Sequence, residues 1–191
     1  MKLSDYNLQE LIAKAEKACA CGLALREVKK YSSVRELLEG SASRDLASWA
    51  YWYALRVING RWEEAEPIIA KDPHSAYGYA IDVIKGRWEE AEPVIASDPH
   101  SAYLYARFVL KGRWEEAEPV IATDPNFAYL YARNVIKGRW EKAEQTIATD
   151  PCWAYEYATD ILKGRWEEAE PVIFTNSYYA EEYKKFLKED D

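Results

Sequence analysis

Apolar side chains recur along this chain with the spacing of an amphipathic helix. In one stretch they follow the i, i+3, i+4, i+7 pattern that places side chains on one face of a helix: Ala76, Tyr79, Ala80 and Val83. Asp72 and Pro73 precede this stretch as an N-cap and a first-turn proline, and Gly86 follows it where a helix end favours a left-handed residue. The pattern predicts a helix over 73–85, which we call an A helix.

A second, shorter helix is expected after each A helix. The run Glu89-Glu90-Ala91-Glu92 favours a helix start, because the carboxylates of its three glutamates complement the exposed N–H groups of a first turn. This B helix is expected to end near Ala96, before Asp98-Pro99. A proline interrupts it in most copies, which should bend the helix or shift its start, and Gln145 stands at that place in one copy; the prolines are Pro67, Pro93, Pro119 and Pro171.

The helical pair repeats without gaps. GRWEEAEPIIAKDPHSAYGYAIDVIK at 60–85 is followed by close copies, with the GRW motif starting at 60, 86, 112, 138 and 164. Helices this short are marginal alone, so each hairpin must stack on its neighbours. The sequence therefore predicts an all-α fold, an α-solenoid of stacked helix-turn-helix repeats.

The ends of the chain depart from the repeat as capping units should. Residues 1–45 are expected to form an N-terminal helical cap, and residues 46–191 the repeat array, which ends in a polar helix. Within the N-terminal cap the sequence predicts two or three helices, at 8–19, 23–31 and a short one at 34–38, with a loop at 41–43.

Charge and cysteine content narrow the function classes. The net charge of −8 disfavours binding to a phosphate backbone. The three cysteines form no CxxC pair, no N-terminal leader is recognised, and no apolar run is long enough to span a membrane. We therefore expect a cytoplasmic protein that does not bind nucleic acid or insert into a membrane.

Motifs that carry catalysis are lacking. The sequence has no GxGxxG, GxxxxGK[ST], GxSxG or HExxH pattern. His74 and His100 occupy equivalent places in adjacent copies without a carboxylate to complete a metal set, so duplication explains them better than a metal site does. We expect no enzyme, no metal and no cofactor.

The order of helix A, Gly, an aromatic residue, a Glu-Ala pair and Asp-Pro resembles the tetratricopeptide repeat over 48–188. That family has longer units, and here the second helix is about two turns shorter. The GRWEEAE–DPxxAYxYA form is also similar to short repeat proteins of bacteriophage and bacterial genomes. The resemblance implies stacked helical hairpins, with the A helices lining a concave surface that binds another protein, and it implies no particular ligand.

Positions that vary between copies mark the candidate binding surface, which we call the A-helix face. They are the two after Asp-Pro, the one between the tyrosines and the two after Tyr-Ala. Aromatic residues and arginine, which dominate protein-binding hot spots, are frequent there. Drift at solvent positions, or packing between copies, is the alternative. The candidate partner-binding residues are Trp49, Trp52, Arg56, His74, His100, Leu104, Arg107, Phe108, Phe127, Arg133, Trp153 and Glu156.

Residues that are identical in every copy are interpreted as structural. The repeated tryptophans and Tyr-x-Tyr pairs are expected to pack, with the arginine before each tryptophan capping carbonyls or pairing with a glutamate. The repeated glutamates form a solvated stripe or, alternatively, a surface for a basic partner.

Three functions remain open at this point. The preferred hypothesis is a non-catalytic module that binds a protein along the A helices, and self-association is possible. The alternative is a phage-type counter-defence inhibitor that blocks a nucleic-acid-binding enzyme with its acidic surface. A small-ligand site ranks last, because such an array is too open to enclose one.

Overall fold

The computed structural model describes residues 7–18, 25–26, 28–39 and 44–189, and in these ranges every regular element is helical. The chain divides into two compact units, Met1–Ile95 and Ala96–Asp191. This division into compact units does not test the predicted boundary between the N-terminal cap, residues 1–45, and the repeat array, residues 46–191. That boundary stays a prediction.

The first unit contains the N-terminal helices and two hairpins. Its α-helices are α1 (Leu8–Lys17), α3 (Val34–Glu39), α4 (Arg44–Tyr53), α5 (Glu66–Ile69), α6 (Pro73–Tyr79) and α7 (Glu92–Ile95). Helices α4 and α6 continue into π-helical turns, η2 (Ala54–Ile58) and η4 (Ala80–Ile84). Short 3-10 turns, η3 (Glu63–Ala65) and η5 (Glu89–Ala91), precede α5 and α7.

The second unit repeats the same order. Its A helices are α8 (Pro99–Tyr105), α10 (Pro125–Tyr131) and α12 (Pro151–Tyr157), continued by the π-helical turns η6 (Ala106–Leu110), η7 (Ala132–Ile136) and η8 (Ala158–Leu162). Its B helices are α9 (Glu118–Ile121), α11 (Glu141–Ile147) and α13 (Glu170–Ile173). The terminal helix α14 (Ser177–Glu189) has no π-helical turn.

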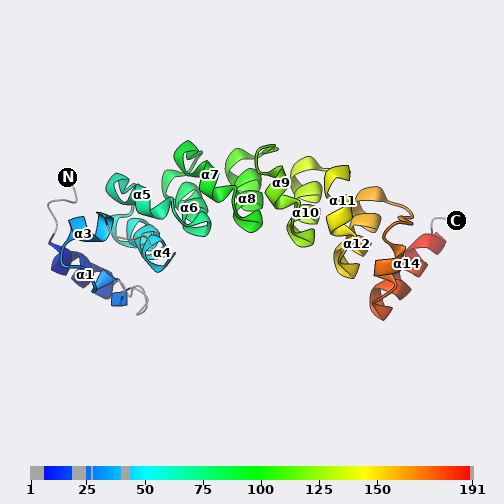
Figure 1. Cartoon of the computed structure of the whole chain (residues 1–191), viewed down its shortest axis with the longest axis horizontal. Helices are drawn as coiled ribbons and strands as arrows, with labels where there is room; N and C mark the ends of the chain where they lie inside the picture. The colour runs from blue at the N-terminus through cyan, green and yellow to red at the C-terminus, as the bar shows by residue number, and fades with distance from the viewer. Residues whose placement is uncertain (1–6, 19–24, 27, 40–43, 190–191) are drawn as a thin grey trace. The chain divides into compact units, whose positions relative to one another are not determined.

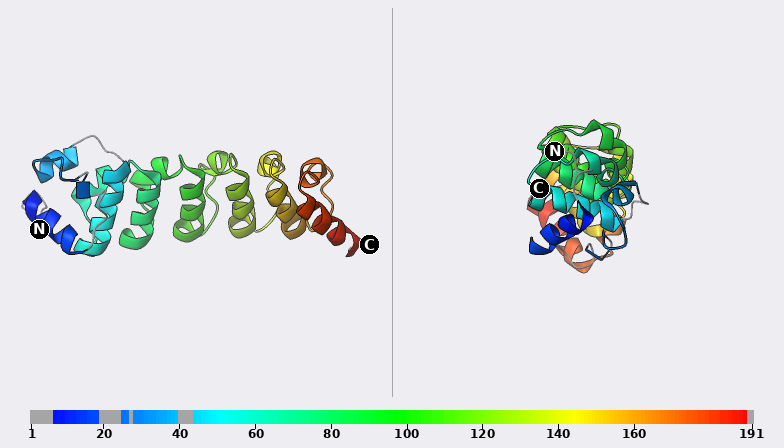
Figure 2. Two further views of the ribbon diagram at one scale, coloured as in Figure 1. Left: turned by 90° about the horizontal axis from the view of Figure 1, so that it is seen from below. Right: turned by 90° about the vertical axis from the view of Figure 1, so that its left-hand side faces the viewer.

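Within each unit the hairpins stack on one another. Helix α4 packs on α5 and α6 in the first unit, and α10 packs on α8, α11 and α12 in the second. Figure 1 shows the successive pairs, and Figure 2 shows α8 and α10 side by side. The predicted all-α helical-repeat fold is confirmed.

The A helices begin at the predicted cap but end differently. The Asp72 carboxylate accepts a 2.8 Å hydrogen bond from the backbone N–H of Ser75, as an N-cap does. At the other end, the expectation that Gly86 adopts the left-handed conformation is wrong, because Lys85 adopts it, with φ 59°. The π-helical turn ends the helix one residue early, and the N–H groups of Lys85 and Gly86 both donate to the Ala80 carbonyl.

Proline sets where each B helix begins. Glu66–Ile69, which contains Pro67, is only four residues long, whereas α11, with Gln145 at the equivalent place, runs for seven. Proline has no N–H to donate within the turn that precedes it, so its helix starts next to it. The predicted shift of the helix start is confirmed.

The N-terminal expectations are met where they can be compared. Helix α1 covers most of the predicted 8–19 segment, and α3 matches the predicted helix at 34–38. Of the predicted helix at 23–31, residues 25, 26 and 28 are helical and 29–30 form a turn, while 23, 24 and 27 lie outside the described residues, as do the whole of the predicted loop 41–43, Cys19 and Cys21.

One repeated contact joins successive hairpins within each unit. The ring of Trp114 packs on Tyr105 of its own hairpin at 5.1 Å, and its backbone N–H donates to the hydroxyl of Tyr131 in the following hairpin at 2.7 Å. Arg113 forms two hydrogen bonds to Glu118, which also accepts from Tyr131. The tryptophan N–H bond and the arginine–glutamate bonds recur at Trp62, Trp140 and Trp166. These tryptophans are therefore packing residues, and the predicted pairing of arginine with glutamate is confirmed.

Candidate functional site

The stacked A helices place the variable residues of each unit along one set of helix surfaces. The candidates differ widely in exposure. Arg56, His74, Arg107, Phe108 and Arg133 are exposed, whereas the partly buried candidates are Trp52, His100, Leu104, Phe127, Trp153 and Glu156.

Trp49 does not belong to this surface. Its side chain is 1% exposed and lies in the core, with its ring 5.1 Å from Tyr53 and 6.0 Å from Trp62. It stands at the second position after the helix start, where Ser75 and Ser101 are also buried. The prediction that Trp49 belongs to the binding surface is therefore wrong, because this side chain packs against neighbouring residues, which was the alternative.

Phe127 and Trp153 occupy the same position and pack partly between hairpins. The Phe127 ring lies 4.9 Å from His100, and the Trp153 ring stacks on Tyr129 at 5.5 Å. Both large side chains therefore support the stacking of successive A helices, and only part of each remains for a partner.

Arg107 and Phe108 form the most prominent exposed pair on the second unit. The Arg107 guanidinium lies over the Phe108 ring at 4.8 Å and donates to the Tyr103 hydroxyl at 2.5 Å. Phe108 is 43% exposed, a large fraction for an aromatic side chain. The tyrosine hydroxyl and the ring restrict the arginine, so little conformational entropy is left to lose on binding.

Arg133 is held by a similar tyrosine and by a carboxylate. It donates to the Tyr129 hydroxyl at 2.8 Å and pairs with Asp160 at 3.1 Å. The Tyr129 hydroxyl in turn donates to Asp160 at 2.7 Å. Burial, then the bond to Asp160, raises the pKa of Tyr129 above its ordinary value, so this hydroxyl stays protonated and keeps its bond to the carboxylate.

The first unit carries a related contact between A helices. The hydroxyl of Tyr51 donates to Asp82, 31 residues later, and its ring lies against Gly78. A Cβ at residue 78 would meet the Tyr51 ring at 2.9 Å. Glycine at this variable position leaves the space that the tyrosine of the preceding A helix occupies, and a larger residue there would make that ring shift.

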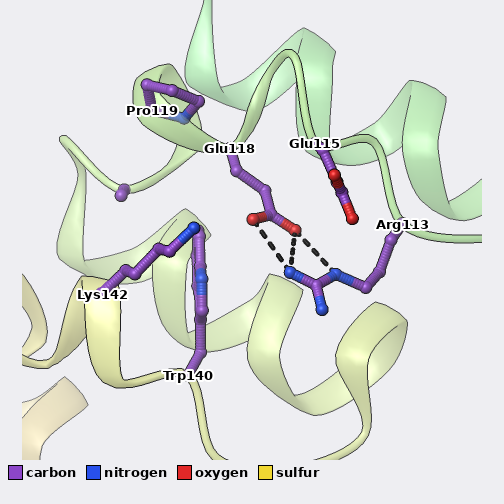
Figure 3. A pocket seen from close by; sticks show the side chains of 7 residues that line it. Arg113, Glu115, Glu118, Pro119, Trp140 and Lys142 are labelled. Carbon is purple, nitrogen blue, oxygen red and sulfur yellow. Dashed lines mark hydrogen bonds and ion pairs between the residues drawn. The ribbon is translucent and has the colours of Figure 1, made fainter.

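Cavities lie beside these elements in the second unit. One of 450 Å³ contains the candidate Glu156 and is lined by Tyr155, Glu156, Thr159, Asp160, Glu182, Lys185 and Phe186. Another, of 510 Å³, contains the candidate Arg133 and is lined by Arg133, Lys137, Gly138, Asp160, Ile161 and Lys163. A third, of 520 Å³, lies on the B-helix side between α9 and the start of α11. Figure 3 shows it with Glu118 held by Arg113, while Lys142 lies beside Trp140 at the other wall.

Sequence reasoning missed a contact made by the first tyrosine of three Tyr-x-Tyr pairs. Tyr103 and Tyr129 are buried, as expected of core residues, and the hydroxyls of Tyr51, Tyr103 and Tyr129 each bond a side chain 31 residues later in the next A helix. The signal was available, because the partners Asp82, Asn134 and Asp160 all stand at one variable position, 31 residues after the tyrosine.

Within the described ranges, no three His, Cys, Asp or Glu residues are grouped so that they could hold a metal ion. No helix among those residues is both long and apolar enough to cross a membrane. No protein-family model, curated protein or solved structure matches the chain.

Proposed function

We propose that this chain is a non-catalytic module that binds another protein along its A-helix face. The observation that carries the proposal is the contrast between two sets of residues. The Trp-Arg-Glu-Tyr bonds repeat identically and fix the hairpins, while the A-helix face varies and presents Arg107, Phe108 and Arg133.

The physical argument rests on pre-organisation. Arginine and aromatic side chains contribute most to binding when they are held in place beforehand. Here the tyrosine hydroxyls restrict both arginines, and repeat stacking sets the spacing between them. A partner segment lying across α8 and α10 would meet a guanidinium, an aromatic ring and a second guanidinium at fixed separations.

The test compares capture of a partner with stability of the fold. The double variant Phe108→Ala/Arg133→Ala should reduce the affinity for a protein captured from the producing cells at least tenfold, while the melting temperature falls by less than about 3 °C. Glu116→Ala, which changes an exposed residue of the B-helix side, is the matched control and should bind as the wild type does. Undiminished capture by the double variant would reject the proposal, as would a parallel loss of binding and folding.

A second candidate rests on the exposed glutamates before the B helices. Glu63, Glu89, Glu115 and Glu167 are all exposed, and they favour an acidic surface of the kind that a phage counter-defence inhibitor would place in the groove of a nucleic-acid-binding enzyme. Lys142 stands where the other hairpins carry a glutamate, which weakens that surface in the second unit. This candidate predicts partner binding that falls steeply between low and high salt, because exposed charges are screened over ~10 Å at 0.1 M; salt-insensitive binding excludes it.

A further inference from the structure

Two neighbouring contacts between A helices in the second unit differ by a single kind of group. Between α10 and η8, Asp160 supplies a carboxylate that accepts from Tyr129 at 2.7 Å and pairs with Arg133 at 3.1 Å. Glu156 adds a second carboxylate 3.5 Å from the same hydroxyl. Both donors at this contact, the neutral tyrosine hydroxyl and the charged guanidinium, therefore have acidic partners.

The contact between α8 and η7 has the same donors without a carboxylate. Tyr103 and Arg107 stand 26 residues before Tyr129 and Arg133, while Asn134 and Leu130 replace Asp160 and Glu156. No carboxylate of the described residues forms an ion pair with Arg107, whose side chain is exposed. The positive charge of Arg107 is thus not neutralised by a carboxylate, whereas that of Arg133 is neutralised by Asp160.

The hydroxyl of Tyr103 also lacks an acceptor. Its oxygen accepts from Arg107 at 2.5 Å and from the Asn134 amide nitrogen at 3.0 Å. The same amide nitrogen donates to the Leu130 carbonyl at 2.9 Å, which fixes the orientation of the amide, because the reversed amide would place two oxygens together. In the described part of the chain no group accepts the phenolic proton of Tyr103, a side chain that is only 2% exposed.

We propose that Tyr103 and Arg107 bind the side-chain carboxylate of an aspartate or glutamate supplied by the partner protein. This inference rests on the proposed function and names the chemistry that its surface selects. The incoming carboxylate accepts from both donors as Asp160 does at the next contact, with charge-assisted hydrogen bonds that are stronger than neutral ones. Phe108, against the same guanidinium, provides an apolar surface for the residue next to the acidic one.

Acetate is the probe for this site, and acetamide is its uncharged control. Titrated into the full chain, acetate should shift the NMR signals of the Arg107 side-chain Nε–H and of the backbone around residue 107, and acetamide should not. Because the measurement needs no partner, its failure leaves the wider protein-binding proposal standing, and a failure to capture a partner leaves the acetate result standing.

Two reciprocal substitutions make the test specific. Asn134→Asp supplies the missing carboxylate from within the chain, so the apparent affinity for acetate at Arg107 should fall at least tenfold. Asp160→Asn removes the carboxylate from the neighbouring contact and should create an acetate response at Arg133 that the wild type lacks. An acetate response at Arg107 that Asn134→Asp leaves unchanged, or one equalled by acetamide, would overturn the proposal, as would a wild-type chain that does not respond at all.

Discussion

The backbone N–H of Trp114 donates a 2.7 Å hydrogen bond to the hydroxyl of Tyr131, which lies in the next hairpin. Both residues are buried, so the bond connects two hairpins through an acceptor that water cannot replace. The oxygen of Tyr131 also lies 3.3 Å from Glu118, to which its proton is donated. A single phenolic group thus satisfies a backbone donor and orients the carboxylate that binds Arg113.

Tyr131→Phe should therefore lower the free energy of unfolding by about 1–3 kcal/mol, because it leaves a buried N–H without an acceptor. Urea unfolding followed by tryptophan fluorescence measures the change. Tyr155→Phe is the matched control, because no hydrogen bond from the Tyr155 hydroxyl is found among the described residues, and its effect should stay within about 0.5 kcal/mol. Equal effects of the two substitutions would contradict the assigned role of the Tyr131 hydroxyl.

Alkaline pH should weaken the fold through the same group. Burial, with a smaller contribution from Glu118, raises the pKa of Tyr131 to about 12, above the ordinary value of about 10. A pKa that is higher in the folded state contributes stability below pH 10, and that contribution is lost as the pH rises toward 12, because the unfolded chain releases its proton first.

The measurement is the urea midpoint at pH 9, 10 and 11. The midpoint should fall with pH in the wild type, and it should fall less in Tyr131→Phe, which lacks this proton. A Tyr131→Phe variant with the same pH dependence as the wild type would assign the alkaline effect to other tyrosines.

The left-handed residue at the end of each A helix offers a stabilising substitution. Lys137 has φ 60°, a conformation that costs a side-chain-bearing residue about 1–2 kcal/mol, whereas glycine adopts it freely. After the extra backbone entropy of glycine is subtracted, Lys137→Gly should raise the free energy of unfolding by up to about 1 kcal/mol.

The reciprocal control is Lys142→Gly, which changes an exposed lysine inside α11. Because Lys142 lies in the first turn of α11, glycine there should lower the free energy of unfolding by less than the about 1 kcal/mol that it costs in a helix interior. Chemical denaturation of both variants gives the comparison, and destabilisation by Lys137→Gly would show that the lysine side chain itself supports the turn.

The fourth GRW hairpin tests the role of proline in the B helices. Gln145→Pro should remove the helical signal at residues 141–143, shortening α11 to the four-residue form of α9, with less than about 1 kcal/mol lost. Backbone NMR chemical shifts report the helix start. Thr146→Pro, at a place where no hairpin has proline, should cost about 3 kcal/mol. Similar losses for both variants would mean that the position of proline within the repeat is unimportant.

The sequence predicted the helices better than it predicted the contacts between them. The Asp-Pro caps, the repeat period and the effect of proline were readable because they depend on residues close together along the chain. Lys85 was missed because glycine is the usual left-handed residue at a helix end, and the π-helical turn that moves this position to Lys85 leaves no mark on an i, i+3, i+4 pattern.

The candidate site was predicted less well, for a different physical reason. Comparing copies separates variable from constant positions. It does not tell whether the side chain at a variable position faces solvent or packs against a neighbouring hairpin. Trp49 therefore lies in the core, and Phe127 packs on His100. The tyrosine contacts join residues that are 31 positions apart, which is one 26-residue repeat plus five residues along the next A helix. The sequence of a single hairpin does not predict that pairing.

The Trp–Tyr contact between hairpins also bears on how chains of this kind change length. Within each unit the contact is made by the same atoms wherever it is seen, at Trp62 as at Trp140. Duplication or loss of one in-register copy would leave each of these contacts chemically unchanged, while it would bring different variable residues side by side. Recombination between the nearly identical copies could thus produce new binding surfaces without requiring a new core.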